Sequence, residues 1–122
     1  MARRLLTACP SSPNCVSTLA PPDDTRHAIA PYLYRKPLSE ARDVLKATVA
    51  GLARTKLVDE DGSYLHYEFT SLLLRFVDDV EFLFDEAAKT VHFRSASRTG
   101  YGDLGVNRRR MEDIRSRLAG KL

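Results

Sequence analysis

Residues 79–97 read DVEFLFDEAAKTVHFRSAS, and this stretch decides the fold. Apolar side chains recur at every second position from residue 79 to 85, with Val80, Phe82 and Phe84 on one side. The alternation returns over residues 90–97, and this period is typical of a half-buried strand. The residues between the two runs are few and polar enough to form a turn. The stretch therefore predicts two antiparallel neighbours with their aromatic residues facing one core.

Upstream segments extend this pair into a sheet. The predicted strands cover residues 56–59, 63–70, 79–85 and 90–97. Asp61-Gly62 is a hairpin turn signal between the first two strands. The connection from residue 70 to 79 contains no Gly, Pro or Asn, and a helical turn over 71–77 would suit its apolar side chains. Short turns between consecutive strands predict a four-stranded antiparallel meander.

Two amphipathic helices flank the predicted sheet. Residues 39–53 carry an apolar stripe at helical spacing, with Ser39 as the expected N-cap. Residues 105–119 carry a second stripe, and Asp103 is placed to cap that helix. Both stripes need burial, so we expect an α+β domain over 38–122 with two helices on one face of the sheet. The expected core comprises Leu45, Leu52, Phe69, Phe82, Phe84, Phe93 and Ile114.

The N-terminal segment differs from the rest in composition. All six prolines lie within residues 9–37, which predicts an irregular arm over 1–37 packed on the domain. Ile29 to Tyr34 could add a short edge strand. Cys9 and Cys15 are spaced so that a small disulfide loop or two free thiols are both open, and the spacing is not that of a zinc site.

Size and charge bound the function classes. The chain has 122 residues and a mass of 13.7 kDa, which suits one domain. No apolar run reaches the roughly 20 residues of a membrane helix. The net charge of +3 hides an acidic middle, because residues 55–93 carry three basic and nine acidic side chains. This middle can attract the basic segments within the fold, or the basic segments can form a face for an anionic partner.

The compartment is expected to be the cytoplasm by default. The first residues, MARRLL, resemble the charged opening of a signal peptide, but Pro10 and polar residues replace the apolar region that should follow. Export or membrane attachment would require a leader outside these residues.

Residues 94–110, RSASRTGYGDLGVNRRR, form the most unusual segment. Gly100, Gly102 and Gly105 fit the G-x-G-x-x-G pattern of dinucleotide sites. That mechanism also needs a second parallel strand and an acidic residue about 20 positions on, and the 15 or so residues that follow the motif contain neither. The remaining interpretations are a turn whose arginines pair with carboxylates, or a loop that binds an anion at a helix start.

Three carboxylates lie at or just before the start of the first strand of the hairpin: Asp78, Asp79 and Glu81. They could perform acid–base work or bind a cation. Alternation, however, places Asp79 and Glu81 on one side of the strand and Asp78 on the other. A tight turn would set Glu81 opposite Arg94 and bring Asp78 or Asp79 near Arg98. This arrangement favours structural ion pairs.

Three segments together carry a family resemblance. They are CPSSPNCVS at 9–17, RFVDDVEF at 75–82, and the glycine- and arginine-rich segment at 94–110. The chain resembles the domain-of-unknown-function 1499 family of bacteria and plastid-bearing organisms, whose members often carry an N-terminal membrane or export segment. The resemblance implies an architecture and a functional surface, and it implies no particular reaction.

We therefore expect an uncharacterised small domain, noncatalytic, without cofactor or metal. Its partner would be an anionic small molecule or an acidic protein surface. The candidate binding site comprises Arg98, Tyr101, Asp103, Asn107 and Arg108 with Asp78 or Asp79. One alternative is an enzyme that uses Asp78, Asp79 or Glu81 with Arg98. A further alternative is nucleic-acid binding through Arg108-Arg109-Arg110, which lacks an aromatic platform except Tyr101 and is not favoured.

Overall fold

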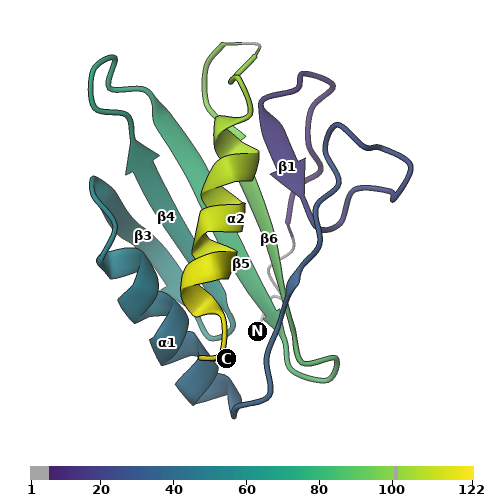
Figure 1. The fold of residues 1–122 in the computed structure, drawn as a ribbon, viewed down its shortest axis with the longest axis vertical. Helices are drawn as coiled ribbons and strands as arrows, with labels where there is room; N and C mark the ends of the chain where they lie inside the picture. Colours follow the sequence, from purple (N-terminus) through teal and green to yellow (C-terminus); the bar gives the residue numbers. More distant parts are fainter. Residues whose placement is uncertain (1–5, 101) are drawn as a thin grey trace.

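A computed structural model describes residues 6–100 and 102–122 and contains six strands and two helices (Figure 1). The elements, in chain order, are β1 (Cys15–Ser17), β2 (Tyr32–Leu33), α1 (Leu38–Ala50), β3 (Thr55–Asp61), β4 (Tyr64–Thr70), β5 (Val77–Asp85), β6 (Thr90–Ser97) and α2 (Val106–Leu118). All six strands belong to one antiparallel sheet, so the fold is α+β.

The sheet has six strands rather than the four predicted. Its order is β1-β6-β5-β4-β3, and β2 also pairs with β6. β1 lies against the end of β6 near Ala96, whereas β2 lies against its beginning at Val91. Both additional strands come from the proline-rich arm. β2 lies within residues 29–34, where the sequence allowed a short edge strand, whereas β1 was not predicted. At three residues, β1 is too short for a period-two pattern to reveal it.

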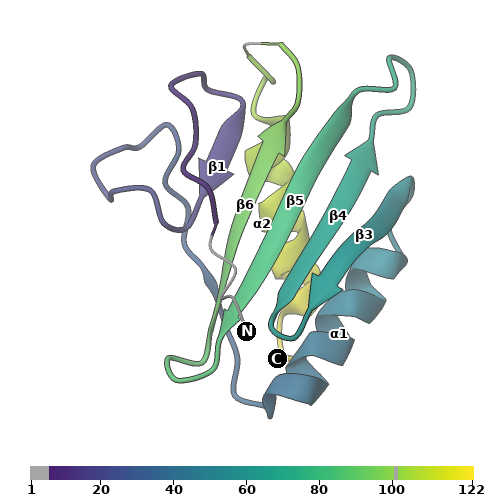
Figure 2. The ribbon, with the colours of Figure 1, turned by 180° about the vertical axis from the view of Figure 1, so that it is seen from behind.

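Both helices cover the same face of the sheet, and the opposite face is open (Figures 1 and 2). α1 begins at Leu38 after Pro37, so the expected cap at Ser39 was wrong by two residues. A proline suits this position because its fixed φ and missing N–H cost nothing at a helix start. The core contains buried side chains from α1, α2, β4, β5, β6 and the arm, and β3 adds only the partly buried Leu57. Its members include Tyr34, Leu45, Phe69, Phe82, Phe84, Phe93, Met111 and Ile114. Leu52, expected in the core, is only partly buried at its margin.

Side chains of β5 alternate strictly between the two faces. Val80, Phe82 and Phe84 are buried under the helices, and Phe82 lies edge-on to Tyr67 of β4. Asp79 and its neighbours at every second position point to the open face and are half-buried. Hydrophobic burial on one face therefore fixes which side every polar residue of the strand occupies.

The connection from β4 to β5 is a loop rather than the helical turn considered above. The backbone N–H of Ser71 donates to the carbonyl of Phe76 at 2.9 Å, and the N–H of Phe76 donates to Ser71 Oγ at 2.9 Å. These two bonds close the loop at its base. β5 consequently starts at Val77, two residues earlier than expected.

The outer strand β3 has an irregular pairing with β4. Its register shifts between Leu57 and Asp59, which leaves Val58 without a partner in the ladder. Glu60 of the same strand is bound by Arg42 and Lys46 of α1.

Among the described residues, neither helix is long and apolar enough to cross a membrane.

Candidate functional site

The glycine-rich loop between β6 and α2 is organised by Asp103. Its Oδ1 accepts the backbone N–H of Gly105 at 2.8 Å, and its Oδ2 accepts the backbone N–H and the side-chain amide of Asn107 at 3.1 and 2.7 Å. Partial burial opposes ionisation, but these hydrogen bonds together lower the pKa of the Asp103 carboxyl below its usual value. Gly105 precedes α2 at φ +79°, a conformation that favours glycine. The carboxylate of Asp103 therefore occupies backbone N–H groups at the start of α2 that could otherwise bind an external anion.

Asn107 is the centre of a buried polar network. Its amide donates to the carbonyl of Asn14 at 3.2 Å and to Ser97 Oγ at 3.0 Å, and its Oδ1 accepts from Ser95 Oγ at 2.7 Å. The side chain is fully buried, so unpaired amide atoms would be costly. Arm, β6 and α2 are therefore joined through one side chain.

Arg110 occupies the same end of the core. Its Nη1 donates to Asn107 Oδ1 at 2.7 Å, and its Nη2 donates to Asp78 Oδ2 at 2.6 Å. The guanidinium also lies over the ring of Phe69, 4.9 Å from its centroid. Both partners of the ion pair are nearly buried, so the guanidinium of Arg110 stabilises the fold and is not exposed to an external ligand.

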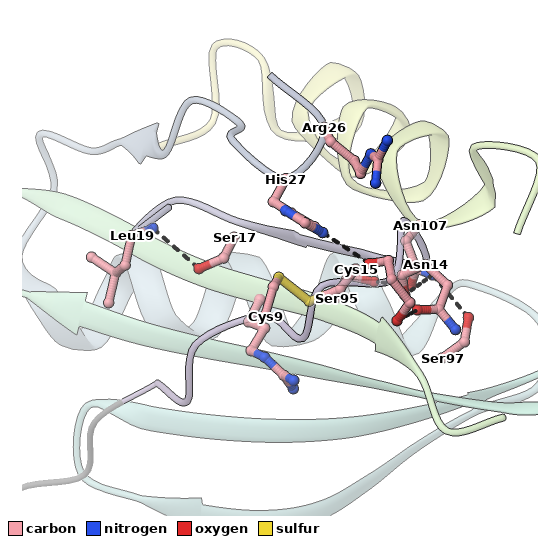
Figure 3. The surroundings of a disulfide bond; sticks show 12 residues. Cys9, Asn14, Cys15, Ser17, Leu19, Arg26, His27, Ser95, Ser97 and Asn107 are labelled. Atoms are coloured by element: carbon pink, nitrogen blue, oxygen red, sulfur yellow. Dashed lines mark hydrogen bonds between the residues drawn. A yellow bond between two sulfur atoms is a disulfide. The ribbon is translucent and has the colours of Figure 1, made fainter. Parts of the chain in front are cut away.

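A disulfide between Cys9 and Cys15 closes a loop within the arm, next to Asn14, which contacts this network (Figure 3). The structure thus selects the disulfide from the two states that the spacing left open. Asn14, beside Cys15, donates its amide to the carbonyl of Gly100 at 2.8 Å. His27 bonds to the carbonyl of Ser12 at 2.8 Å and closes the arm over the disulfide loop. The quoted cysteine motif and the glycine-rich motif are therefore parts of one packed unit.

Arg98 lies on the open face of the sheet, on the other side from Asn107. Its Nε and Nη2 donate to the two carboxylate oxygens of Asp79 at 2.8 and 2.9 Å, and Nη2 also reaches Glu68 at 2.6 Å. His66 bonds to Asp79 at 2.8 Å. The bonds from Arg98, reinforced by His66, lower the pKa of Asp79 despite its partial burial. The prediction that a tight turn brings Arg98 to this carboxylate is confirmed.

The second carboxylate of the open face is also paired. Glu81 lies opposite Arg94 in the ladder, as the turn predicted, and the two side chains approach to 3.6 Å. Tyr64 donates its hydroxyl to the same carboxylate. Each carboxylate proposed for acid–base work is thus engaged by an arginine: Asp78 by Arg110, Asp79 by Arg98 and Glu81 by Arg94.

The structure divides the predicted binding residues between the two faces. Asp103 and Asn107 lie together at the start of α2, Arg108 is on the same helix, and Asp78 joins them through Arg110. Arg98 and Asp79 lie on the open face. The expected single cluster fails for a simple reason, because Arg98 follows Ser97 by one residue and alternation turns it away. Tyr101 lies outside the described residues.

Arg108 lies beside the arm and lines a hollow of about 300 Å³. Its Nη2 donates to the carbonyls of Thr25 and Arg26 at 3.4 and 3.3 Å. The hollow is also lined by Arg26, Gly102, Asp103 and Gly105. Figure 3 shows the side chain of Arg26 at the α2 side of the arm. Sequence reasoning missed Arg26, because nothing but the folded arm brings it within reach of a helix some 80 residues later.

Two other expectations concern metal ions and nucleic acids. Within residues 6–100 and 102–122, no group of three His, Cys, Asp or Glu side chains is placed to hold a metal ion. The three consecutive arginines of α2 have different surroundings. Arg108 contacts the arm, Arg109 donates to the carbonyl of Leu104 at 2.6 Å, and Arg110 points into the core. They do not form one exposed row for a phosphate backbone.

Comparison with known proteins extends the resemblance noted from the motifs. No curated protein and no solved structure matches the chain. A family model described as "Protein of unknown function (DUF1499)" matches residues 5–118, which include the disulfide loop, the acidic strand and the glycine-rich loop. Because this match spans nearly the whole sequence, the chain belongs to the DUF1499 family.

Proposed function

We propose that this protein is a noncatalytic binding or accessory domain, and that an anionic ligand occupies the hollow between Arg26 and Arg108. One observation carries the proposal: two guanidinium groups from separate segments line one hollow. Neither makes an ion pair with a residue in the described part of the chain. An acidic group entering there would meet two guanidinium groups and one carboxylate, Asp103, and therefore a net positive charge.

The carboxylate of Asp103 lowers the positive charge of the hollow, but the two guanidinium groups outnumber it. Asp103 is the carboxylate in its lining, and both of its oxygens already accept hydrogen bonds from the start of α2. The bonds from Arg108 to the arm are long and involve only Nη2. Most donors of its guanidinium remain available for a ligand, because arginine presents several N–H groups in a fixed fork.

The proposed site needs both the N-terminal arm and the domain that follows it. We assign residues 1–37 as an arm packed on a domain at 38–122, whose central sheet is the meander β3 to β6. The arm supplies Arg26 and the domain supplies Arg108, so the hollow exists only while the arm is docked. The disulfide and the bond from Asn107 to Asn14 support that docking.

The test is thermal unfolding in rising concentrations of inorganic phosphate or sulfate. A ligand that binds only the folded state raises the melting temperature. We expect a concentration-dependent rise for the wild type that is lost in Arg26→Ala and Arg108→Ala. Arg117→Ala is the matched control, because it removes one charge from the same helix at a side chain paired only with Asp113.

Two results would reject the assignment. One is the absence of any anion-dependent rise in the wild type. The other is an undiminished rise in Arg108→Ala. If Arg98→Ala alone removed the rise, the ligand would occupy the open face and the original cluster around Arg98 would be favoured.

A further inference from the structure

The loop between β4 and β5 exposes a run of large apolar side chains. Leu72, Leu73, Leu74 and Phe76 are each more than half exposed, and Leu73 reaches 87%. Isolated exposed leucines are ordinary on protein surfaces, but contiguous ones mark interaction sites. This loop therefore requires an explanation beyond the stability of the fold.

The backbone conformation of the loop keeps these apolar side chains exposed. The two hydrogen bonds between Ser71 and Phe76 close the base, and the N–H of Thr70 donates to the carbonyl of Arg54 at 3.0 Å just below it. Arg75 adopts φ +57°, which turns the chain sharply back toward β5. The residues between are thus held as a projecting turn and cannot fold down onto the core.

A second loop adds to this surface. The connection from β6 to α2 exposes Leu104 at 92%, and the first residue of α2, Val106, is 40% exposed. The N–H of Arg98 donates to the carbonyl of Val77 at 3.2 Å, so the two loops start from neighbouring strands. Figures 1 and 2 both place these loops at the same end of the sheet. We call the side chains of Leu72, Leu73, Leu74, Phe76, Leu104 and Val106 the apolar tip.

Positive charges surround the apolar tip. Arg75 belongs to the loop itself, Arg54 donates its Nε to the carbonyl of Thr70 at 3.0 Å, and Arg109 donates to the carbonyl of Leu104. In the described residues none of the three forms an ion pair. Glu68 and Asp79 on the open face are bound by Arg98, and Asp103, which precedes Leu104, accepts hydrogen bonds from the start of α2.

We propose that the apolar tip docks on an anionic lipid bilayer. Exposed apolar side chains with three arginines beside them match the layers of a membrane surface, where acyl chains lie below charged headgroups. A protein partner would instead require a groove shaped to receive the convex loop. Leucines in the acyl boundary supply binding that is insensitive to salt, and the arginines supply attraction to anionic headgroups.

Co-sedimentation with vesicles tests the proposal. One set contains phosphatidylcholine alone, and the other contains phosphatidylcholine with phosphatidylserine. We expect stronger binding to the second set and weaker binding as salt rises. The double variant Leu73→Ser/Leu74→Ser should lower the partition constant about tenfold or more. Arg75→Ala should reduce it severalfold on anionic vesicles only, about the effect of one basic residue.

Leu33→Ser is the matched control for lost apolar surface. Leu33 is 72% exposed, close to the 70% of Leu74, but it pairs with Thr90 at the opposite end of β6. Its replacement should leave vesicle binding unchanged. Circular dichroism melting of each variant separates loss of docking from loss of the fold.

Three results would overturn the proposal. The first is a wild type that sediments equally with and without vesicles. The second is an equal loss of binding in Leu33→Ser. The third is concentration-dependent self-association in ultracentrifugation that the Leu73→Ser/Leu74→Ser variant abolishes while vesicles have no effect, which would assign the apolar tip to a second copy of the chain.

Discussion

The two faces of the central sheet differ in the side chains that they present: one face buries apolar residues under the helices, and the other carries ion pairs. On β5, Val80 and Phe82 are completely buried beneath the helices, whereas Asp79 and Glu81, one residue away from each, form ion pairs on the open face. Apolar burial contributes free energy in proportion to the area removed from water. Ion pairs that remain in contact with solvent contribute little. Stability should therefore depend on the covered face, and the open face should tolerate change.

The largest effect is expected at the centre of the covered face. Phe82→Ala removes a fully buried ring that packs against Tyr67 and Phe93, and should lower the free energy of unfolding by about 3–5 kcal/mol. Urea denaturation provides the measurement. Leu83→Ala, one residue along and on the open face, is the control and should cost far less. Equal costs for the two variants would break the comparison.

An intermediate effect is expected where a charge lies on the covered face. Asp78→Asn leaves the guanidinium of Arg110 without its carboxylate in a nearly buried position, at a cost of about 2 kcal/mol. Asp79→Asn is the matched change on the open face. Chemical denaturation of both variants at neutral pH would measure the difference. A cost at Asp79 as large as at Asp78 would mean that burial does not separate the two pairs.

The smallest effect is expected from Asp79 itself, and its pH dependence has a definite sign. The pKa of this carboxyl is lowered in the folded state below its ordinary value of 3.8. Its contribution is therefore fully present above that value and is lost as the pH falls through the folded pKa. Asp79→Asn should cost less than about 1 kcal/mol at neutral pH, because the pair is partly solvated.

The acid limb of the stability curve provides the check on this sign. Unfolding measurements on wild type and Asp79→Asn should begin to converge near pH 3.8, where this carboxyl takes up a proton in the unfolded chain, and should meet below the lower pKa of the folded state. A difference that stayed constant or grew toward low pH would contradict the assigned direction.

The sequence predicted the central sheet and both helices because their signals are periodic. Burial of Val80, Phe82, Phe84 and Phe93 follows directly from period-two alternation, and the helix bounds differ from those predicted by one to three residues. The pairing of Glu81 with Arg94 followed from the length of one turn. A strand or helix repeats its apolar and polar pattern over many residues, so one residue that departs from the pattern does not change the prediction.

The arm and the candidate site could not be predicted in the same way. The carbonyl of Asn14 meets the amide of Asn107 across 93 positions, and no local pattern encodes such a contact. Arg26 and Arg108 likewise meet only through the folded arm. The number of arginines suggested an anion site, which remains a proposal, and the alternation of side chains at Ser97 places Arg98 on the open face, away from Asn107.

The irregular outer strand of the sheet has a consequence for solubility and aggregation. A long flat edge strand is a template on which a second chain can add by backbone pairing. Here one edge consists of two short arm strands, and at the other the shifted register near Val58 interrupts the ladder of β3. Charged side chains such as Lys56 and Asp59 line that strand. Both edges are thus poor templates for edge-to-edge pairing and poor seeds for cross-β growth.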